Sequence, residues 1–381
     1  MGIVQIRSID DLEQVTGKTF PDDEKKGLQE VIDKYPVRFT HHLVGLIKNS
    51  SGIGKQYLPD TQELEKYGTI APFEEGLHTS ENHGFERIYT DRAIITLNFI
   101  CPSYCRFCFR KSRVLKSKTA MTLDDIDIAV EIVQKEKDVK GVLITGGDPF
   151  LDPEKLLYLI ENLITIDHLT FIRIGTRSFL TQPENLTEDI ANKLSEFIKP
   201  NPENPEKSKN LLVVTHINHP DEISPESVKA FNRFTKQGIP LRNQAVLLKD
   251  VNDDIKTLRR LFETLLANNV IPYYLFHCMP LEGMKYLRPS IQRGIDIFKE
   301  LSKLSGLISP HFAIVTQIGK IRLIHTSKLK YKWIDGEKFV VLTSPYKTKE
   351  FLKSTNQQKL PDNCHSDDEG YIVVDYLDGE D

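Results

Sequence analysis

The 381-residue sequence has few cysteines, a single tryptophan and no long hydrophobic run. No stretch approaches the roughly 20 consecutive apolar residues that a membrane-spanning helix needs, so we expect neither such a helix nor a membrane partner. The N-terminal residues lack an apolar core of the length found in signal peptides. With five Cys residues and no export signal, we expect a cytoplasmic protein whose thiols stay reduced and free to bind a metal.

An excess of positive charge is also missing. The chain has 50 Lys and Arg residues against 54 Asp and Glu residues, which gives a formal net charge of -4. This balance argues against a general nucleic-acid-binding surface, so we expect no nucleic-acid partner. The length suits one large α/β barrel or two ordinary domains.

Three of the five Cys residues lie close together, at Cys101, Cys105 and Cys108, directly after the apolar run 93–99. Three clustered thiolates without a fourth partner suit a four-iron cluster that leaves one iron open to a substrate or cosubstrate. A structural zinc site is the alternative, but zinc usually binds a Cys pair together with a second pair or with histidines. The spacing therefore favours an open iron–sulfur cluster, with these cysteines as metal ligands and catalytic residues.

From residue 91 onward, short β-rich runs alternate with amphipathic stretches of helical length. The predicted strands are 93–99, 142–145, 171–175, 211–215, 241–246 and 272–276. The predicted helices are 123–137, 153–164, 188–198, 225–236, 254–268 and 289–305. Asp152 and Ser224 each precede a proline and are typical helix caps. Strands that alternate with helices predict parallel β-α units, with functional residues at the carboxyl ends of the strands. Six units are fewer than the eight of a complete barrel, so we predict an α/β fold with a partial (βα)6 TIM-type barrel rather than a doubly wound sheet.

The segments on either side of the predicted barrel differ from it. We predict three parts: an N-terminal accessory segment, 1–90, the barrel, 91–305, and a strand-rich C-terminal extension, 306–381, that closes the barrel. The first part has a helix at 22–35 and is otherwise loop-like, for example at 50–54 and 79–84. Strands of the third part are predicted at 312–316, 321–324, 339–343 and 371–374. The sequence leaves open the role of the acidic tail.

The pattern C-x-x-x-C-x-aromatic-C after the first barrel strand resembles the signature of radical S-adenosylmethionine (SAM) enzymes. A second mark is Gly146-Gly147-Asp148 after the second strand, although two glycines there also suit a plain turn. From about residue 39 to about residue 320 the chain resembles lysine 2,3-aminomutases and their relatives in the order and spacing of its motifs. Those motifs are 91–92, 101–111, 143–149, 173–177, 215–220, 243–248, 250–253 and 272–274.

The resemblance implies an enzyme in which an electron enters a [4Fe-4S] cluster held by the three cysteines. SAM is then cleaved to a 5′-deoxyadenosyl radical, which abstracts hydrogen from an amino-acid-like small molecule. The electron donor would be a flavodoxin or ferredoxin, and a homo-oligomer is one alternative for the assembly. The positions implied for SAM contact are Arg110, Gly146, Gly147, Asp148, His216 and Gln244. Plainer interpretations remain open: His216 satisfies backbone groups, Gln244 is a buried amide, and Arg92 and Arg177 form ion pairs. These two arginines also suit a phosphate or carboxylate.

The sequence departs from this family at the position of its pyridoxal 5′-phosphate (PLP) lysine. That lysine follows a run of glycines in lysine 2,3-aminomutases, whereas here Gly319-Lys320-Ile321 stands without the run. A buried or cationic setting would lower the pKa of Lys320 enough for covalent attachment of PLP. A surface lysine in a strand turn is the alternative, and the sequence leaves both open.

Two aspartates of the lysine-specific members are missing as well. In those members one aspartate follows the two tyrosines, in the stretch that here runs from Tyr273-Tyr274 to Met279 and contains no aspartate. The other aspartate corresponds to Val315 or Thr316 of this chain. A cationic substrate would lose its charge partners there, so we predict a 2,3-aminomutase-type rearrangement on an amino acid other than lysine. Candidate replacements are His277, Glu282 and Lys285. Two alternatives stay open: a PLP-independent radical SAM enzyme, and a non-catalytic iron–sulfur or zinc-binding barrel.

Overall fold

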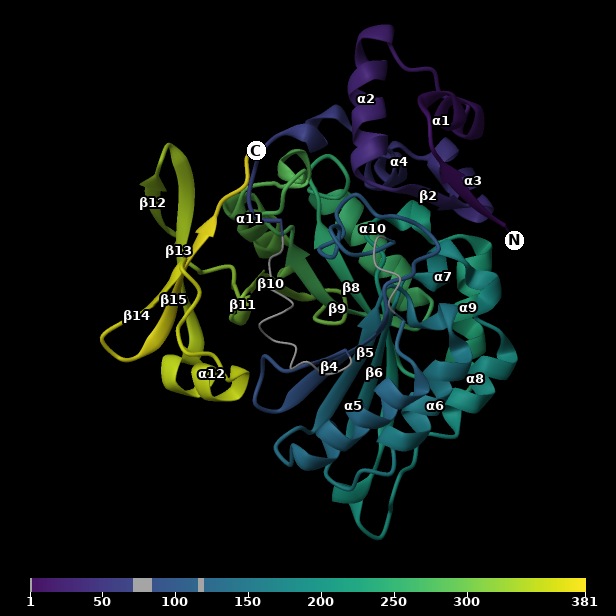
Figure 1. Ribbon diagram of the computed structural model, residues 1–381, viewed down its shortest axis with the longest axis vertical. Helices are drawn as coiled ribbons and strands as arrows, with labels where there is room; N and C mark the ends of the chain where they lie inside the picture. Colours follow the sequence, from purple (N-terminus) through teal and green to yellow (C-terminus); the bar gives the residue numbers. More distant parts are fainter. Residues whose placement is uncertain (1, 71–83, 116–119) are drawn as a thin grey trace.

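The computed structural model describes residues 2–70, 84–115 and 120–381 (Figure 1). Its largest element is a nine-stranded sheet in the order β11-β10-β9-β8-β7-β6-β5-β4-β3. The strands are β3 (Phe85–Glu86), β4 (Arg92–Asn98), β5 (Gly141–Gly146), β6 (Phe171–Thr176), β7 (Asn210–Thr215), β8 (Leu241–Leu247), β9 (Val270–His277), β10 (His311–Thr316) and β11 (Gly319–Arg322). Strands β4 to β10 run parallel, and β3 and β11 pair antiparallel at the two edges.

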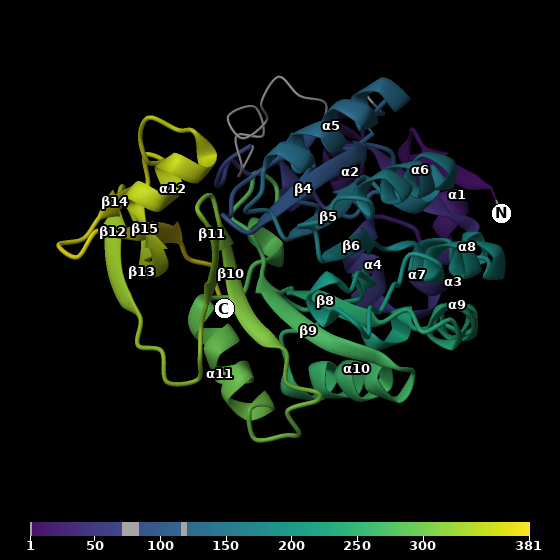
Figure 2. The ribbon, with the colours of Figure 1, turned by 90° about the horizontal axis from the view of Figure 1, so that it is seen from below.

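The sheet curls, and its helices cover the outer side (Figure 2). These helices are α5 (Leu123–Lys135), α6 (Pro153–Leu163), α7 (Ser178–Thr181), α8 (Glu188–Ser195), α9 (Pro225–Lys236), α10 (Ile255–Ala267) and α11 (Ile291–Leu301). The prediction of a partial (βα)6 barrel is therefore confirmed, with β10 as a further parallel strand. The predicted caps also form: Asp152 accepts the backbone N–H of Lys155 at 3.3 Å, and Ser224 accepts that of Ser227 at 3.1 Å.

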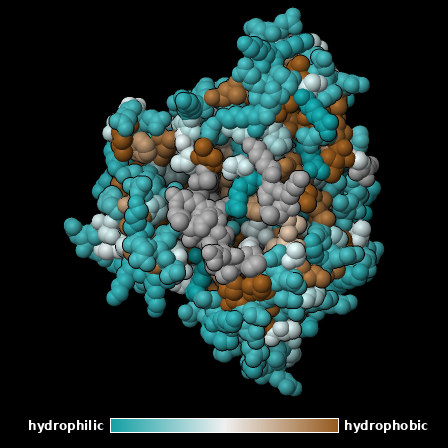
Figure 3. Space-filling view, viewed as in Figure 1, coloured by the Kyte–Doolittle hydropathy of each residue, from teal (hydrophilic) through white to brown (hydrophobic). Residues whose placement is uncertain are grey.

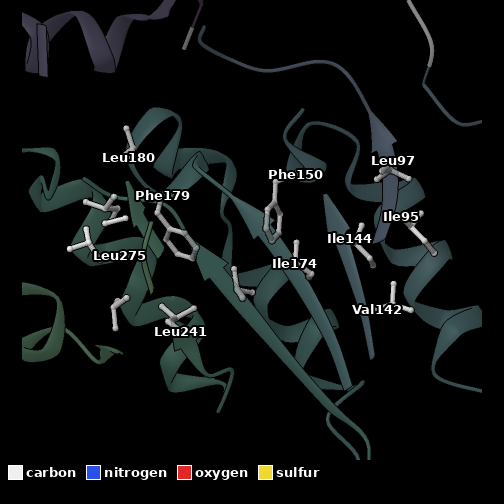
Figure 4. Close-up of a cluster of buried hydrophobic side chains, with 14 of the residues drawn as sticks. Ile95, Leu97, Val142, Ile144, Phe150, Ile174, Phe179, Leu180, Leu241 and Leu275 are labelled. Carbon is white, nitrogen blue, oxygen red and sulfur yellow. The ribbon is translucent and has the colours of Figure 1, made fainter. Parts of the chain in front are cut away.

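The hydrophobic core lies between the curled sheet and the outer helices (Figure 4). Alternate strand residues such as Val142 and Ile144 are fully buried there, as the two-residue period of a strand requires. The ring of Phe179 packs against those of Phe231 and Phe234, with centroids 5.1 and 5.2 Å apart. The outer face of each strand is thus used for packing, which leaves the inner face for other side chains.

The N-terminal segment is more regular than the sequence indicated. Besides α2 (Asp22–Lys34), which was predicted, it contains β1 (Ile3–Ile6), α1 (Ile9–Thr16), β2 (Val37–Thr40), α3 (His41–Asn49), α4 (Ser51–Tyr57) and the short 3-10 helix η1 (Thr61–Leu64). The prediction of a loop at 50–54 is therefore wrong, whereas most of 79–84 lies outside the described residues. Glycines weakened the helical pattern, but one of them has a packing role: a Cβ on Gly52 would lie 3.0 Å from the His219 ring.

The C-terminal part forms a second, four-stranded sheet in the order β12-β13-β15-β14. Its elements are β12 (Lys330–Ile334), β13 (Glu337–Lys347), α12 (Thr348–Thr355), β14 (Cys364–Ser366) and β15 (Tyr371–Leu377). The hairpin of β10 and β11 belongs to the barrel sheet instead, because β10 pairs with β9. Strand pairing in the barrel thus continues beyond residue 305, and the three-part division of the chain stays a prediction.

The end of the chain is fastened to the barrel by a fully buried arginine. The Arg288 guanidinium donates to the backbone carbonyls of Cys278, Leu377 and Asp378 at 2.9, 2.7 and 2.9 Å. The Asp378 carboxylate in turn accepts the backbone N–H of Ile291 at the start of α11, at 2.9 Å. An anion at a helix N-terminus is favourable, so at least this residue of the acidic tail has a structural role.

Within the residues described, no helix combines the length and the apolar character that crossing a bilayer requires. Hydrophilic residues cover most of the face seen in Figure 3, with apolar residues in scattered patches.

Replacing Arg288 by Met should lower the free energy of unfolding by about 3 kcal/mol, because three buried carbonyls would lose a charged donor. Urea denaturation would measure the change. Lys299→Met, at an exposed position on α11, is the control and should change it by less than about 0.5 kcal/mol. Equal stability of Arg288→Met and the wild type would contradict this account of the C-terminus.

Candidate active site on the inner face of the barrel

The inner face of the curled sheet gathers the polar and aromatic residues that the outer face excludes. Gln244 on β8 is in register with Tyr274 on β9, and Tyr274 is in register with His311 on β10. Val315 on β10 pairs with Lys320 on β11. Residues in register on neighbouring strands point to the same face, so these five side chains share one side of the sheet.

The three clustered cysteines lie in the loop that follows β4, at the carboxyl end of that strand. All three are half-buried, and the backbone N–H of Cys108 donates to the Cys105 carbonyl at 3.2 Å. Burial raises the pKa of the Cys101 thiol well above its usual range, and the neighbouring Cys108, Asp148 and Cys105 raise it further. Such thiols ionise when a metal supplies the missing positive charge.

Across the described part of the chain, no three His, Cys, Asp or Glu side chains converge on one point to hold a single metal ion. A four-iron cluster asks for a different arrangement, because each cysteine binds a different iron. The three thiols fit that requirement, because they neighbour one another in one loop. The Arg110 guanidinium is also close enough to oppose the rise in the pKa of Cys101.

Two glycines, Gly146 at the end of β5 and Gly147 directly after it, allow the Cys loop to approach the sheet. A Cβ on Gly146 would lie 2.1 Å from the Asn98 carbonyl oxygen, and one on Gly147 would lie 2.0 Å from that of Ile100. The Gly147 N–H donates to the Asn98 carbonyl at 2.6 Å, and the Asp148 N–H donates to that of Ile100 at 2.8 Å. Gly146 also has a φ of +133°, which few other residues adopt. The glycines therefore hold the start of the Cys loop against the end of β5.

Asp148 is a buried carboxylate with several donors. It accepts hydrogen bonds from the Thr176 hydroxyl at 2.8 Å, from the Arg177 backbone N–H at 2.9 Å and from the Phe150 backbone N–H at 3.1 Å. Burial raises the pKa of Asp148 despite these donors. Since its oxygens fasten β6 to the turn after β5, Asp148 links two neighbouring strand ends beside the cysteines.

Two further predicted residues, Arg110 and His216, lie around the same loop. The Arg110 side chain is buried and donates to the Gly146 carbonyl at 3.3 Å. The His216 ring packs edge-on against Phe107 of the loop, 5.4 Å between centroids, and its Nε2 lies 3.1 Å from Asn218 Oδ1. Burial lowers the pKa of His216 well below its usual range, with a further contribution from Arg177, so the imidazole is neutral at pH 7.

The structure separates the two arginines that the sequence grouped as anion-binding candidates. Arg177 lies with the Cys loop, where its guanidinium is 4.9 Å from the Phe107 ring centre and pairs with the buried Glu222 at 3.0 Å. Arg92 is the first residue of β4, and its guanidinium lies 3.9 Å from the Tyr89 ring centre. Arg92 therefore belongs with Lys320 rather than with Arg177.

Lys320 lies where the two edges of the curled sheet approach one another. Its backbone N–H donates to the Tyr89 hydroxyl at 3.0 Å, and its amine lies 4.6 and 4.9 Å from the ring centres of Tyr274 and Phe276. Burial lowers the pKa of Lys320 to about 7, and the nearby guanidinium groups of Arg173 and Arg92 add to the effect. The amine therefore packs against aromatic rings beside the β10–β11 turn, and attachment of PLP to Lys320 stays a prediction.

Arg173 on β6 is, after Arg92, the second arginine whose guanidinium lies near Lys320. Its Nε is buried and has no hydrogen-bond partner among the described residues. Burial lowers the pKa of Arg173 as well. A buried donor without a partner is costly, so this nitrogen marks a place for an acceptor.

The three candidate substitutes for the missing aspartates are occupied elsewhere. The buried His277 Nε2 lies 2.8 Å from the Pro289 carbonyl. Glu282 pairs with Lys34 at 2.5 Å, and Lys285 pairs with Glu380 at 3.3 Å. The structure therefore gives no support to these three as substrate anchors.

Sequence reasoning missed the residues that hold the Cys loop from behind. The fully buried Glu63 of η1 accepts from Arg106 Nε and Nη2 at 2.8 and 2.5 Å and from Lys111 Nζ at 2.6 Å. The Arg106 side chain also donates to the Pro36 carbonyl at 2.9 Å, and its backbone N–H donates to that of Gln56 at 2.8 Å. Charged residues between and after the cysteines were the available signal, but nothing in the sequence connected them to Glu63.

The curled parallel sheet and the Cys loop after its first parallel strand are the features of one known class of protein. A family model described as the radical SAM superfamily matches residues 95–262, which run from β4 to α10 and include the Cys loop. Fold and site together define a radical SAM protein.

Individual relatives narrow this class. The chain is 32% identical over 317 residues to L-lysine 2,3-aminomutase of Methanococcus maripaludis, which covers 81% of this chain and 70% of that protein. It is 31% identical over 230 residues to glutamate 2,3-aminomutase of Clostridioides difficile, covering 60% and 52%. A solved radical SAM methyltransferase from Sphaerobacter thermophilus is similar over 61% of this chain and 69% of that one, with 15% identity and a TM-score of 0.42. The chain belongs to the family of L-lysine 2,3-aminomutases and their relatives, and radical SAM membership implies a [4Fe-4S] cluster and SAM.

Replacing Glu63 by Gln should lower the free energy of unfolding by about 3–5 kcal/mol, because two buried cations would lose their shared partner. The Cys loop should loosen with it. After anaerobic reconstitution, the variant should therefore bind less iron and give a weaker or broadened electron paramagnetic resonance signal.

The control is Glu263→Gln, which removes an exposed partner of Arg259 on α10 and should leave iron content and stability within error. Full iron content with an unchanged spectrum in Glu63→Gln would mean that the buried carboxylate does not position the cysteines.

Proposed function

We propose that the protein catalyses a radical 2,3-aminomutase-type rearrangement on an amino acid other than lysine, with PLP bound to Lys320. The observation that carries this proposal is the setting of Lys320: an amine on the inner face, above two aromatic rings, whose pKa is lowered to about 7. A neutral amine is the form that attacks a carbonyl group. The enzyme would act in the cytoplasm on a small-molecule substrate, with a flavodoxin- or ferredoxin-type electron donor.

The residues around Lys320 fit the cofactor. Tyr274 and Phe276 offer flat apolar surfaces to an aromatic ring, and their own rings are stacked 4.8 Å apart. Arg92 and Arg173 offer guanidinium donors to a phosphate, and the buried Arg173 Nε has no other acceptor among the described residues.

The residues around the Cys loop fit the cluster and SAM. We assign Cys101, Cys105 and Cys108 to the cluster. Contacts to SAM are assigned to Arg110, Gly146, Gly147, Asp148, His216 and Gln244. When bound, the cluster and SAM would supply a 5′-deoxyadenosyl radical, and PLP would hold the migrating amino group. Arg177, paired with Glu222 against Phe107, would help to hold the loop in place.

A lysine substrate is disfavoured by the apolar side chains that stand where the lysine-specific members have aspartates. Val315 packs against the cluster of Tyr274, Phe276 and Ala313, in register with Lys320. Met279 packs against a separate apolar cluster after β9. A second ammonium group at either place would lose water without gaining a carboxylate.

Replacing Cys105 by Ala should abolish SAM cleavage, because two cysteines cannot hold the four-iron cluster that delivers the electron. Dithionite-driven formation of 5′-deoxyadenosine would be measured under anaerobic conditions. Cys364→Ala, on β14 outside the barrel, is the matched control and should retain wild-type cleavage. Retained cleavage in Cys105→Ala would rule out the assignment, and zinc with no iron in the wild type would favour the non-catalytic alternative.

Borohydride reduction in the presence of PLP should place a pyridoxyl label on Lys320, as peptide mass spectrometry would show. Labelling should increase between pH 6 and pH 8 with a midpoint of about 7, because the amine is protonated below its pKa and free above it. Lys193, exposed on α8, is the internal control and should stay unlabelled under limiting PLP. SAM cleavage without a Lys320 label would favour the PLP-independent enzyme.

A further inference from the structure

We infer that the substrate carries an anionic side chain and that Arg322 on β11 recognises it. This inference rests on the proposed function, since it concerns the part of the substrate that extends beyond Lys320. It assigns Arg322 as a specificity-determining residue.

Arg322 and Lys320 point to the same side of β11 because they are two residues apart. Both reach the same ring: Arg322 Nη2 donates to the Tyr274 hydroxyl at 3.0 Å, while the Lys320 amine lies 4.6 Å from the Tyr274 ring centre. A small molecule bound at the amine therefore lies within reach of the guanidinium. Arg322 is exposed, and among the described residues the hydrogen bond to Tyr274 is the one found for its five N–H donors.

The other guanidinium groups near Lys320 already have an assignment. A phosphate carries about −1.5 to −2 charge at pH 7, and Arg92 and Arg173 together match it. Arg322, whose guanidinium lies 5.7 Å from the Tyr274 ring centre, is then without an assigned partner on the ligand. His311 adds a polar ring 5.6 Å from that of Tyr274.

Among the residues that the structure describes, no acidic side chain forms an ion pair with Arg322. For the cations Arg92, Arg173, Lys320 and Arg322, the one ion pair found within the described part of the chain joins Arg92 to Asp91, at 3.7 Å. The groups that raise the pKa of Arg322 are tyrosines, first the Tyr274 hydroxyl, and no carboxylate. A cationic side chain would meet repulsion here, a neutral one would leave the guanidinium without a charge partner, and a carboxylate would match it.

Titration calorimetry on the reconstituted, SAM-loaded protein without reductant tests this inference, because no turnover occurs. The ligands are L-glutamate and L-aspartate, their amides L-glutamine and L-asparagine, and L-lysine. We expect the acid that binds better to bind at least about tenfold more tightly than its amide. This is the difference in affinity that one hydrogen bond between charged groups provides. Arg322→Gln should remove this preference by weakening the acid alone, whereas Arg259→Gln, an exposed arginine on α10, should keep it.

Equal affinity for acid and amide in the wild-type protein would overturn the inference without any variant. An equal loss for acid and amide in Arg322→Gln would also overturn it, since the guanidinium would then bind the α-carboxylate. The two proposals fail differently. A missing pyridoxyl label on Lys320 with the acid preference intact would remove the aminomutase proposal alone. A pyridoxyl label on Lys320 without a preference for the acid over its amide would contradict only the inference of an anionic substrate.

Discussion

The alternation of side chains along the parallel strands is the constraint on which the rest of this structure depends. Val142 and Ile144 of β5 and Ile172 and Ile174 of β6 are apolar and buried under the outer helices, and they alternate with residues of the inner face, so the register of these strands is fixed. A slip by one residue would carry Ile172 and Ile174 to the inner face and Arg173 into the core. The same packing that stabilises the barrel therefore determines which side chains face the site.

Two kinds of buried charge can be distinguished against this background. Glu63, Arg106 and Lys111 form a closed group, as do Arg288 and its backbone carbonyls, and both fasten one segment to another. Burial still lowers the pKa of Lys111 to about 8, although Glu63 opposes this. Arg173 and Lys320 lack such partners in the described structure. Charges that fold stability does not use are typical of functional sites, because their desolvation is repaid only when a ligand binds.

Sequence reasoning succeeded where a local pattern decides the outcome. The strands and helices of the barrel followed from hydrophobic period and caps, and the Cys loop followed from the spacing of its thiols. It failed where distant contacts decide: α4 contains two glycines and packs Gly52 against His219, which no propensity reveals. Glu63 lies 43 positions before Arg106, its ion-pair partner, so only the fold brings the two side chains together.

The pairing of Tyr273 and Tyr274 also depends on an irregularity that sequence does not show. The register between β8 and β9 shifts after Asn243, so that Tyr273 becomes an extra residue opposite the β8 strand. A bulge of this kind re-aims a side chain, and here the two tyrosine rings lie 4.3 Å apart. A motif of two tyrosines thus predicts a strand, but not which ring faces the amine.

Strand β6 connects the two halves of the site through rigid backbone. Arg173 on β6 lies near Lys320, and Arg177, the first residue after β6, lies against the Cys loop. At about 3.3 Å per residue, these two α-carbons are separated by roughly 13 Å. The proposed chemistry requires a radical formed near the cysteines to meet a substrate held at the lysine, and a distance set by a strand varies less than one set by a loop. The hydrogen bonds that Thr176 and Arg177 make to Asp148 fix the carboxyl end of β6, so they belong to the geometry of both halves.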